Sequence, residues 1–431
     1  MTNAILTRRA ALQLAGIMAL GLPKGRSQPA NQYGTAAGPN EAAFDEVWQT
    51  VRDRFYDPHL HGLDWPAIRA EYRPQAAAAA SKPALAGVIN AMLARLGASH
   101  TEYYTPDEPA YYQLAGIFAG ALRRHGLQRV FPAGEVTYPG IGIFTRAGQG
   151  GRVFVTGVID GAPASQAGLL LGDEILSADG TPFQPVNSFR GKVGTPVSIA
   201  IRRRANEAPM LVEVTAAQLD PNAMFLKGLQ ASTRIIPGPG GARVGYVHVW
   251  CYAGYAYQRA LEQLIVEGPL GDADALIWDL RDGWGGAQPD YLDLFNPRAP
   301  TMRIMNRSGE ITYEGVHWRK PASMLVNHGT RSGKEVLAYG FKRYRIGEVI
   351  GSQTAGALLA ASAFLMSNGD LLLLAVADVR VDGQRLEGVG VAPTIEVPFD
   401  PAFAAGSDPQ LERALHVLSQ TAGAGTHQGV N

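Results

Sequence analysis

The 431-residue chain has a single cysteine, Cys251, and no excess of charge of either sign. One cysteine excludes an intramolecular disulfide, and its apolar, strand-like context favours a small buried residue over a nucleophile. The 38 basic residues balance 38 acidic ones and form no basic block, which argues against a nucleic-acid partner. No cluster of histidine, cysteine or acidic residues has the spacing of metal ligands, so neither a metal nor another cofactor is implied. No feature predicts an oligomeric state.

The apolar stretch at residues 10–22 is shorter than the roughly 20 residues that a membrane-spanning helix needs. Arg8 and Arg9 precede this stretch, and a polar segment rich in small residues follows it up to residue 40. We interpret residues 1–40 as an export signal, of twin-arginine type, and a linker; an amphipathic N-terminal tail is the alternative. Export would place the protein in the periplasm or another extracytoplasmic compartment, which a chain with one cysteine suits.

With 46% hydrophobic and 18% charged residues, the chain can bury large cores, and its length predicts two or three domains. Residues 41–130 are expected to be helical, because apolar residues from Phe44 to Phe55 recur at helical spacing. A second helix at 85–96 leads into Ser99 and His100.

Residues 131–220 change to short strands and glycine-rich turns, including GAPASQAGL at 161–169 and LGDEILSADG at 171–180. This segment resembles a PDZ domain. The resemblance implies that a peptide adds as a strand to a sheet edge and that backbone amides hold its terminal carboxylate. The candidate carboxylate loop is Gly140, Ile141, Gly142 and Ile143, so protein or peptide ends with an apolar last residue are the expected ligands. A structural β-domain that only gates the cleft is the alternative.

Residues 221–431 alternate strands with helices, which predicts an α/β core. We expect strands at 244–250, 275–280, 323–327, 348–352 and 371–377, helices at 257–266 and 332–344, and a last amphipathic helix from residue 408.

Ser332 follows an apolar strand and a short turn and opens a helix. There its hydroxyl would lie near free backbone N–H groups and the positive end of the helix dipole, where an oxyanion is stabilised. The N–H of Gly333 would be one donor. The alternative is an ordinary N-cap, with Glu335 completing a capping box.

A second glycine-rich loop, DLRDGWGG at 279–286, follows the buried strand at 273–281. Together with SGKE at 332–335, GSQTAG at 351–356 and LEGVGVAP at 386–393, it resembles the ordered motifs of the C-terminal (tail-specific) processing peptidases and their tricorn-core relatives. The resemblance implies a crotonase/ClpP-like layered core and a serine peptidase.

Two catalytic arrangements are known in that family. The tail-specific branch places a lysine where this chain has Ala357, and Lys334 projects to a different helix face from Ser332. The tricorn-like branch uses a Ser-His pair and a glutamate. By that resemblance Ser332 is the nucleophile, His100 the general base, and Glu387 with Ser99 the orienting relay; amides of Gly333 and of Gly285 or Gly286 form the oxyanion hole.

This relay is chemically sound, because imidazole titrates near neutral pH and a carboxylate or hydroxyl can fix its tautomer. His328, four residues before Ser332, is a minor alternative base, whereas His248 on an apolar strand is expected to be packed structure. Two other functions stay open from the sequence. One is an inactive PDZ scaffold that captures protein tails, and the other is an esterase-like hydrolase on the same core.

Overall fold

The computed structural model describes residues 38–296, 298 and 300–425, so the proposed export signal lies outside the described residues. The chain divides into two compact units, which we describe separately. Among the described residues, no helix combines the length and apolar character needed to cross a bilayer.

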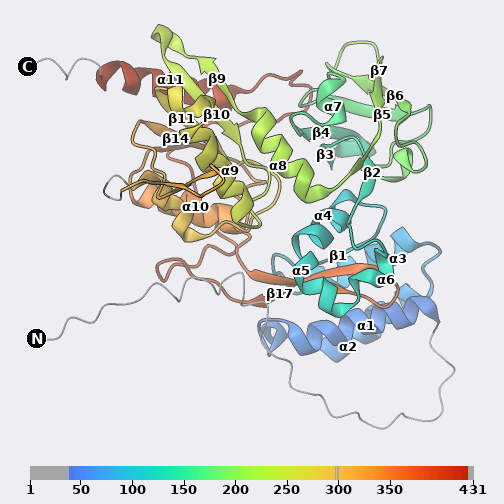
Figure 1. Cartoon of the computed structure of the whole chain (residues 1–431). Helices are drawn as coiled ribbons and strands as arrows, with labels where there is room; N and C mark the ends of the chain where they lie inside the picture. The colour runs from blue at the N-terminus through green and yellow to red at the C-terminus, as the bar shows by residue number, and fades with distance from the viewer. Residues whose placement is uncertain (1–37, 297, 299, 426–431) are drawn as a thin grey trace, which may run out of the picture. The chain divides into compact units, whose positions relative to one another are not determined.

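The first unit comprises the N-terminal helices and a small sheet (Figure 1). Its helices are α1 (Pro39–Arg54), α2 (Trp65–Ala77), α3 (Lys82–Ala94), α5 (Ala119–Leu122) and α6 (Leu127–Val130). Phe44, Val47 and Val51 form the buried stripe of α1, as their spacing predicts. Asp64 caps α2 by accepting the N–H of Ala67.

The sheet of this unit corrects one expectation from the sequence. Strand β17 (Leu371–Ala377) has the bounds that we expected, but it does not join the α/β core. It lies between β1 (Glu102–Tyr104) and β16 (Ala360–Leu365) in an antiparallel three-stranded sheet. The partner of a strand is set by contacts far away in the sequence, so local alternation of strands and helices assigned it to the wrong sheet.

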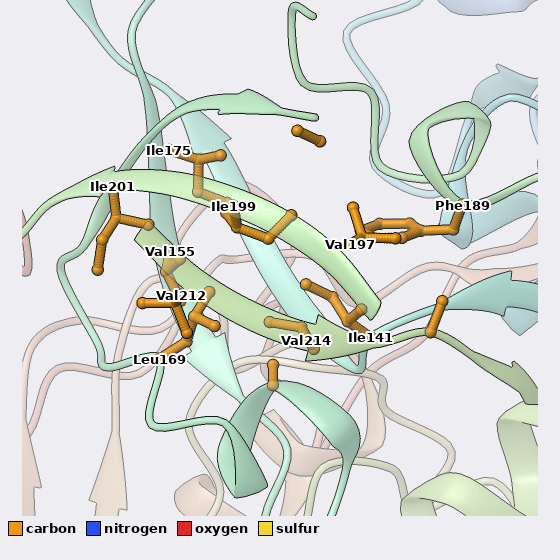
Figure 2. Packing of buried hydrophobic residues seen from close by; sticks show 13 residues of the cluster. Ile141, Val155, Leu169, Ile175, Phe189, Val197, Ile199, Ile201, Val212 and Val214 are labelled. Atoms are coloured by element: carbon orange, nitrogen blue, oxygen red, sulfur yellow. The ribbon is translucent and has the colours of Figure 1, made fainter. Parts of the chain in front are cut away.

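The second unit contains the PDZ-like domain. Its antiparallel sheet has the order β3 (Ile143–Ala147), β4 (Val153–Val158), β5 (Glu174–Ala178), β6 (Pro196–Arg202) and β7 (Met210–Thr215). β2 (Tyr138–Gly140) pairs separately with β8 (Ala217–Leu219), and α7 (Pro163–Gln166) is one short turn of helix. Figure 2 shows Val155, Ile175 and Ile199 packed together inside this domain.

The α/β core, also in the second unit, has a six-stranded sheet of order β18 (Ile395–Glu396), β15 (Glu348–Gly351), β14 (Ala322–Val326), β11 (Ala275–Asp279), β10 (Arg243–His248) and β9 (Arg234–Pro237). All neighbours are parallel except β9 and β10. The core confirms the layered α/β fold, and β9 and β18 are the edge strands that the sequence patterns did not reveal. A ribbon of β12 (Met302–Met305) and β13 (Ile311–Glu314) projects separately.

Helices cover the sheet of the core. They are α8 (Pro221–Ser232), α9 (Tyr255–Val266), α10 (Gly333–Arg343) and α11 (Pro409–Gly425). The helix α4 (Pro109–Ile117), from earlier in the chain, contacts α8, where Asn222 donates to the carbonyl of Gly116. Leu418 of α11 packs with Tyr246, Ile277 and Leu325 of the strands. On the strands, alternate residues face opposite sides, so Trp278 instead contacts Phe341 of α10.

Candidate active site

Four loops meet at the carboxyl edge of the core sheet. The strands β10, β11, β14 and β15 are parallel, so the segments that follow them must leave from the same edge. These segments are 249–254, 280–286, 327–332 and 352–358, and they contain Ser332 and the glycine-rich loop. Topology therefore collects residues that are up to about a hundred positions apart in the sequence.

Ser332 lies at the end of the loop after β14, directly before α10, and is half-buried. It forms the capping box with Glu335 that the sequence predicts, but its backbone has φ 59° and ψ −132°. An ordinary N-cap residue has a negative φ. A positive φ is strained for any residue with a Cβ, and such strain persists where the surroundings fix it. Ser332 is thus held in a geometry that capping alone does not require.

Glu335 is the residue that fixes this geometry, and we did not expect that role from the sequence. Its fully buried carboxylate accepts hydrogen bonds from four donors, one of Ser332 itself and three of the loop after β15. Oε2 accepts the N–H groups of Ser332 (3.1 Å) and Ala357 (2.8 Å), and Oε1 accepts the N–H of Gly356 (2.7 Å) and the hydroxyl of Thr354 (2.6 Å). Burial raises the pKa of Glu335, although these donors oppose the increase.

The glycine-rich loop lies directly against the nucleophile position. A Cβ at Gly285 would collide with the Cβ of Ser332 and would lie 3.0 Å from the nitrogen of Gly333. A Cβ at Gly333 would in turn collide with the backbone of Ala287. Among the described residues, no group accepts a hydrogen bond from the N–H of Gly285, Gly286 or Gly333. The peptide units of Gly285 and Gly333 therefore lie beside Ser332 with N–H groups that have no acceptor, as an oxyanion hole would require.

Glu387 lies in a turn that pairs with the loop after β15. Its Oε2 accepts the N–H of Leu358 at 2.7 Å, and Gly388 donates to the carbonyl of Gly356 at 2.8 Å. Ala357, between those two residues, accepts the N–H of Ser332 at 2.9 Å. Glu387 is thus built into the same edge as Ser332 and is half-buried rather than a solvated turn residue.

Ser99 and His100 belong to the first unit, in the turn between α3 and β1. The hydroxyl of Ser99 is 2.9 Å from Nδ1 of His100, and His100 has a φ of 52°. This pairing fixes the ring orientation through Nδ1. The second unit therefore brings together Ser332, Glu387 and the three glycines, while Ser99 and His100 pair with each other in the first.

Comparisons with known proteins agree with these features. Residues 243–397 match Peptidase family S41, residues 40–94 the tricorn protease C1 domain, and residues 139–214 a PDZ domain. Residues 243–397, which form most of the α/β core, are therefore a peptidase family S41 domain. The protein is a serine-type peptidase, and the segments matched as tricorn C1 and PDZ domains agree with the helical and PDZ-like regions expected from the sequence.

Two curated relatives illustrate the similarity of this S41 peptidase. It is 27% identical to the carboxyl-terminal-processing protease of Synechocystis sp., over 88% of this chain and 89% of the relative. It is 24% identical to the putative tricorn protease homolog 2 of Streptomyces coelicolor, over 87% of this chain but only 32% of that relative, so it spans about a third of the longer protein. In fold it is similar to a crystal structure of the tricorn protease, with TM-score 0.50, 17% identity and coverage of 90% of this chain and 37% of that one.

The other histidines and the cysteine of the peptidase occupy different environments. His328 is exposed, and the described residues show no hydrogen bond between it and Ser332. His248 is buried and stacks on Trp250 with ring centroids 3.7 Å apart; burial lowers its pKa. Cys251 is fully buried, which raises the pKa of its thiol. The environments of His248 and Cys251 are those of packed structure.

Lys334 was expected to point away from Ser332, and its contacts agree with that. Its Nζ donates to the carbonyls of Asp282 (2.8 Å) and Trp250 (3.2 Å). The side chain is completely buried, which the sequence analysis did not anticipate. A signal for that burial was present: Lys334 precedes Leu337, Ala338 and Phe341 by three, four and seven residues and so shares their buried helix face.

The candidate carboxylate loop of the PDZ domain leads into an edge strand. Gly142 has a φ of 77°, and a Cβ there would collide with Ala162. The carbonyls of Ile141 and Gly142 accept the N–H groups of Ala164 and Ile159, so the loop is fixed by two bonds. Strand β3 pairs only with β4 among the described strands, which leaves one side available for an added peptide strand.

Proposed function

We propose that this S41 peptidase is an exported C-terminal processing endopeptidase that cleaves peptide bonds through an acyl-enzyme formed on Ser332. The observation that carries the proposal is the strained Ser332 at the start of α10 with Gly285 packed against it. A hydroxyl held this way is presented to a substrate carbonyl beside backbone donors, as in the strand-to-helix turn of other serine hydrolases. The carboxyl-terminal-processing protease to which the chain is similar along most of both lengths supports the same activity.

In this mechanism Ser332 attacks the scissile carbonyl while His100 takes the hydroxyl proton. The negatively charged oxygen of the tetrahedral intermediate accepts hydrogen bonds from the N–H groups of Gly333 and of Gly285 or Gly286. His100 then returns the proton to the leaving amine, and a water molecule, activated by the same imidazole, hydrolyses the ester. In this proposal the Ser99 contact to Nδ1 fixes the tautomer of His100, so that Nε2 is the nitrogen that transfers the proton, and Glu387 is assigned the role of stabilising the imidazolium.

The PDZ domain supplies the expected selection of substrates. The open edge of β3 and the loop 140–143 suit an extended chain end whose carboxylate accepts backbone N–H bonds. We propose that apolar C-terminal residues are preferred and that export is directed by residues 1–40.

The proposal is tested with Ser332→Ala and His100→Ala variants of the full chain and a fluorophosphonate probe. We expect the probe to label wild type and not Ser332→Ala, and each variant to lose about 10⁴-fold or more in kcat on a peptide substrate with an apolar C-terminus. A matched control is His328→Ala, which should keep wild-type activity. Full activity of His100→Ala would reject the relay. Absence of labelling and of cleavage in the folded wild type would instead favour a tail-binding scaffold, and faster turnover of aryl esters than of peptides would favour an esterase.

A further inference from the structure

Lys334 is a buried cation directly beneath the loop that supplies the proposed oxyanion donors. It occupies the second position of α10, and no part of its side chain reaches solvent. A positive charge is unfavourable both in the interior and near the positive end of a helix dipole. Burial accordingly lowers the pKa of Lys334 to about 8. This placement weakens the fold unless the contacts of the side chain compensate.

Those contacts join two loops at the carboxyl edge of the sheet. Lys334 Nζ donates to the carbonyl of Asp282, which begins the glycine-rich loop with a φ of 50°. It also donates to the carbonyl of Trp250, which at the same time accepts the N–H of Trp284 at 2.8 Å. A Cβ at Gly283 would collide with that Trp250 carbonyl. Lys334 thus fastens the glycine-rich loop to the end of β10.

The same attachment continues to the residue beside the nucleophile. Tyr252 donates its N–H to the carbonyl of Gly285 at 3.1 Å, and Cys251 pairs with Trp284 in a parallel bridge. The orientation of the Gly285 peptide units is therefore set by how the segments 250–252 and 282–285 lie against each other. Lys334 is the side chain that holds both segments at their first residues.

We propose that Lys334 is a positioning residue for the oxyanion hole, holding the glycine-rich loop so that its N–H groups point at the developing oxyanion and adding a positive charge beneath it. This inference rests on the proposed function. The charged and titratable groups that act on Lys334 are Cys251, Asp282, Asp279 and Arg331, and His248 also interacts with its charge. The two aspartates and the thiol favour its charged form and Arg331 opposes it, so the ammonium persists at neutral pH.

The test compares Lys334→Met, which removes charge and donors, with Lys334→Gln, which keeps an N–H donor without the charge. Lys342→Met is the matched control, because Lys342 is an exposed lysine of the same helix that donates to the carbonyl of Ala392. Each variant is assayed for kcat and KM on a peptide and for inhibition by a peptide aldehyde, whose adduct with the serine hydroxyl carries the same oxyanion.

For Lys334→Met we expect kcat to fall about 100-fold, with KM within threefold of wild type and the aldehyde inhibition constant raised by a similar factor. In Lys334→Gln, both kcat and the aldehyde inhibition constant should lie between the values of Lys334→Met and wild type. In Lys342→Met, both should equal those of wild type. In wild type, kcat should also decline above pH 8 as the ammonium is lost, a limb that is absent from Lys334→Met.

Wild-type kcat in folded Lys334→Met would overturn the proposal, and so would a loss that appears in KM alone. If Lys334→Met does not fold, Lys334→Gln decides in the same way: an unchanged kcat and aldehyde affinity would reject the positioning role. Ser332→Ala keeps the two inferences apart. Proteolysis by Ser332→Ala would reject the proposed function itself, whereas Ser332-dependent proteolysis that is indifferent to Lys334 would reject only the role of Lys334.

Discussion

The inactive variant Ser332→Gly should be more stable than the inactive variant Ser332→Ala. Ser332 has φ 59° and ψ −132°, a region that is strained for residues with a Cβ and accessible to glycine. Ser332→Ala keeps the Cβ and therefore the strain, whereas Ser332→Gly removes both. Because both variants lack the hydroxyl, the difference between their free energies of unfolding reports the backbone strain at position 332.

The magnitude follows from two opposing contributions. Strain of this kind costs about 1–3 kcal/mol. Glycine loses more conformational freedom on folding than alanine, which offsets roughly 0.5–1 kcal/mol of the gain. We expect Ser332→Gly to exceed Ser332→Ala by about 1 kcal/mol in free energy of unfolding, or roughly 1–2 °C in Tm for a unit of this size.

The assay is urea denaturation followed by tryptophan fluorescence, with Ala405→Gly as the control. Ala405 has a φ of 53° in the same unit but lies outside the site, so glycine should stabilise there by a comparable amount. If Ala405→Gly is stabilised and Ser332→Gly is no more stable than Ser332→Ala, the reasoning that the nucleophile is strained is refuted.

Three other outcomes are expected. Glu335→Gln turns an amide toward two of the four donors and should destabilise the protein by roughly 2–4 kcal/mol in urea titrations, with Glu412→Gln on an exposed helix face as a neutral control. Gly285→Ala places a methyl group against Ser332 and should lower kcat by at least about 100-fold in a peptide assay while the variant stays folded; wild-type kcat would contradict the packing. The pKa of Lys334 is about 8 in the folded protein and 10.5 for an ordinary lysine, so between these pH values the unfolded chain binds the proton more strongly than the folded protein does. From pH 7.5 to 9.5, the free energy of unfolding of wild type should therefore rise by roughly 2 kcal/mol relative to that of Lys334→Met.

The sequence predicted most of the core because the parallel strands are continuous apolar runs. Residues 275–279 and 322–326 are buried throughout, and their expected bounds differ from the observed ones by only a few residues. The edge strands were missed for the opposite reason: β18 has two residues, and β9 is partly exposed, so neither gives a clear period. The strand β17 was found but assigned to the wrong sheet, because its partner β1 lies about 270 positions earlier.

The sequence predicted those site residues whose backbone conformation restricts the residue type. It did not predict the roles of side chains that depend on burial by other loops. Ser332 and the glycines could be found because a turn, a helix start and a close approach each restrict the residue type. The roles of Glu335 and Lys334 depend on which loops cover the first turn of α10. Those loops follow other strands, so inspection of the helix alone gave only a capping box and a charge on the buried face.

The two buried charges at the start of α10 explain how a strained nucleophile is sustained. Glu335 binds the loop after β15 from one side, and Lys334 binds the loops after β10 and β11 from the other. Ser332 lies two residues before Lys334, and its own N–H binds Glu335, so a change in its backbone would disturb the contacts of this helix start to the three loops. Strain at a single residue persists only when its neighbours determine the conformation more strongly than the residue opposes it. It follows that neutralising Glu335 should loosen the loop after β15, and neutralising Lys334 the loops after β10 and β11. Either change should disturb the geometry of Ser332 and lower kcat.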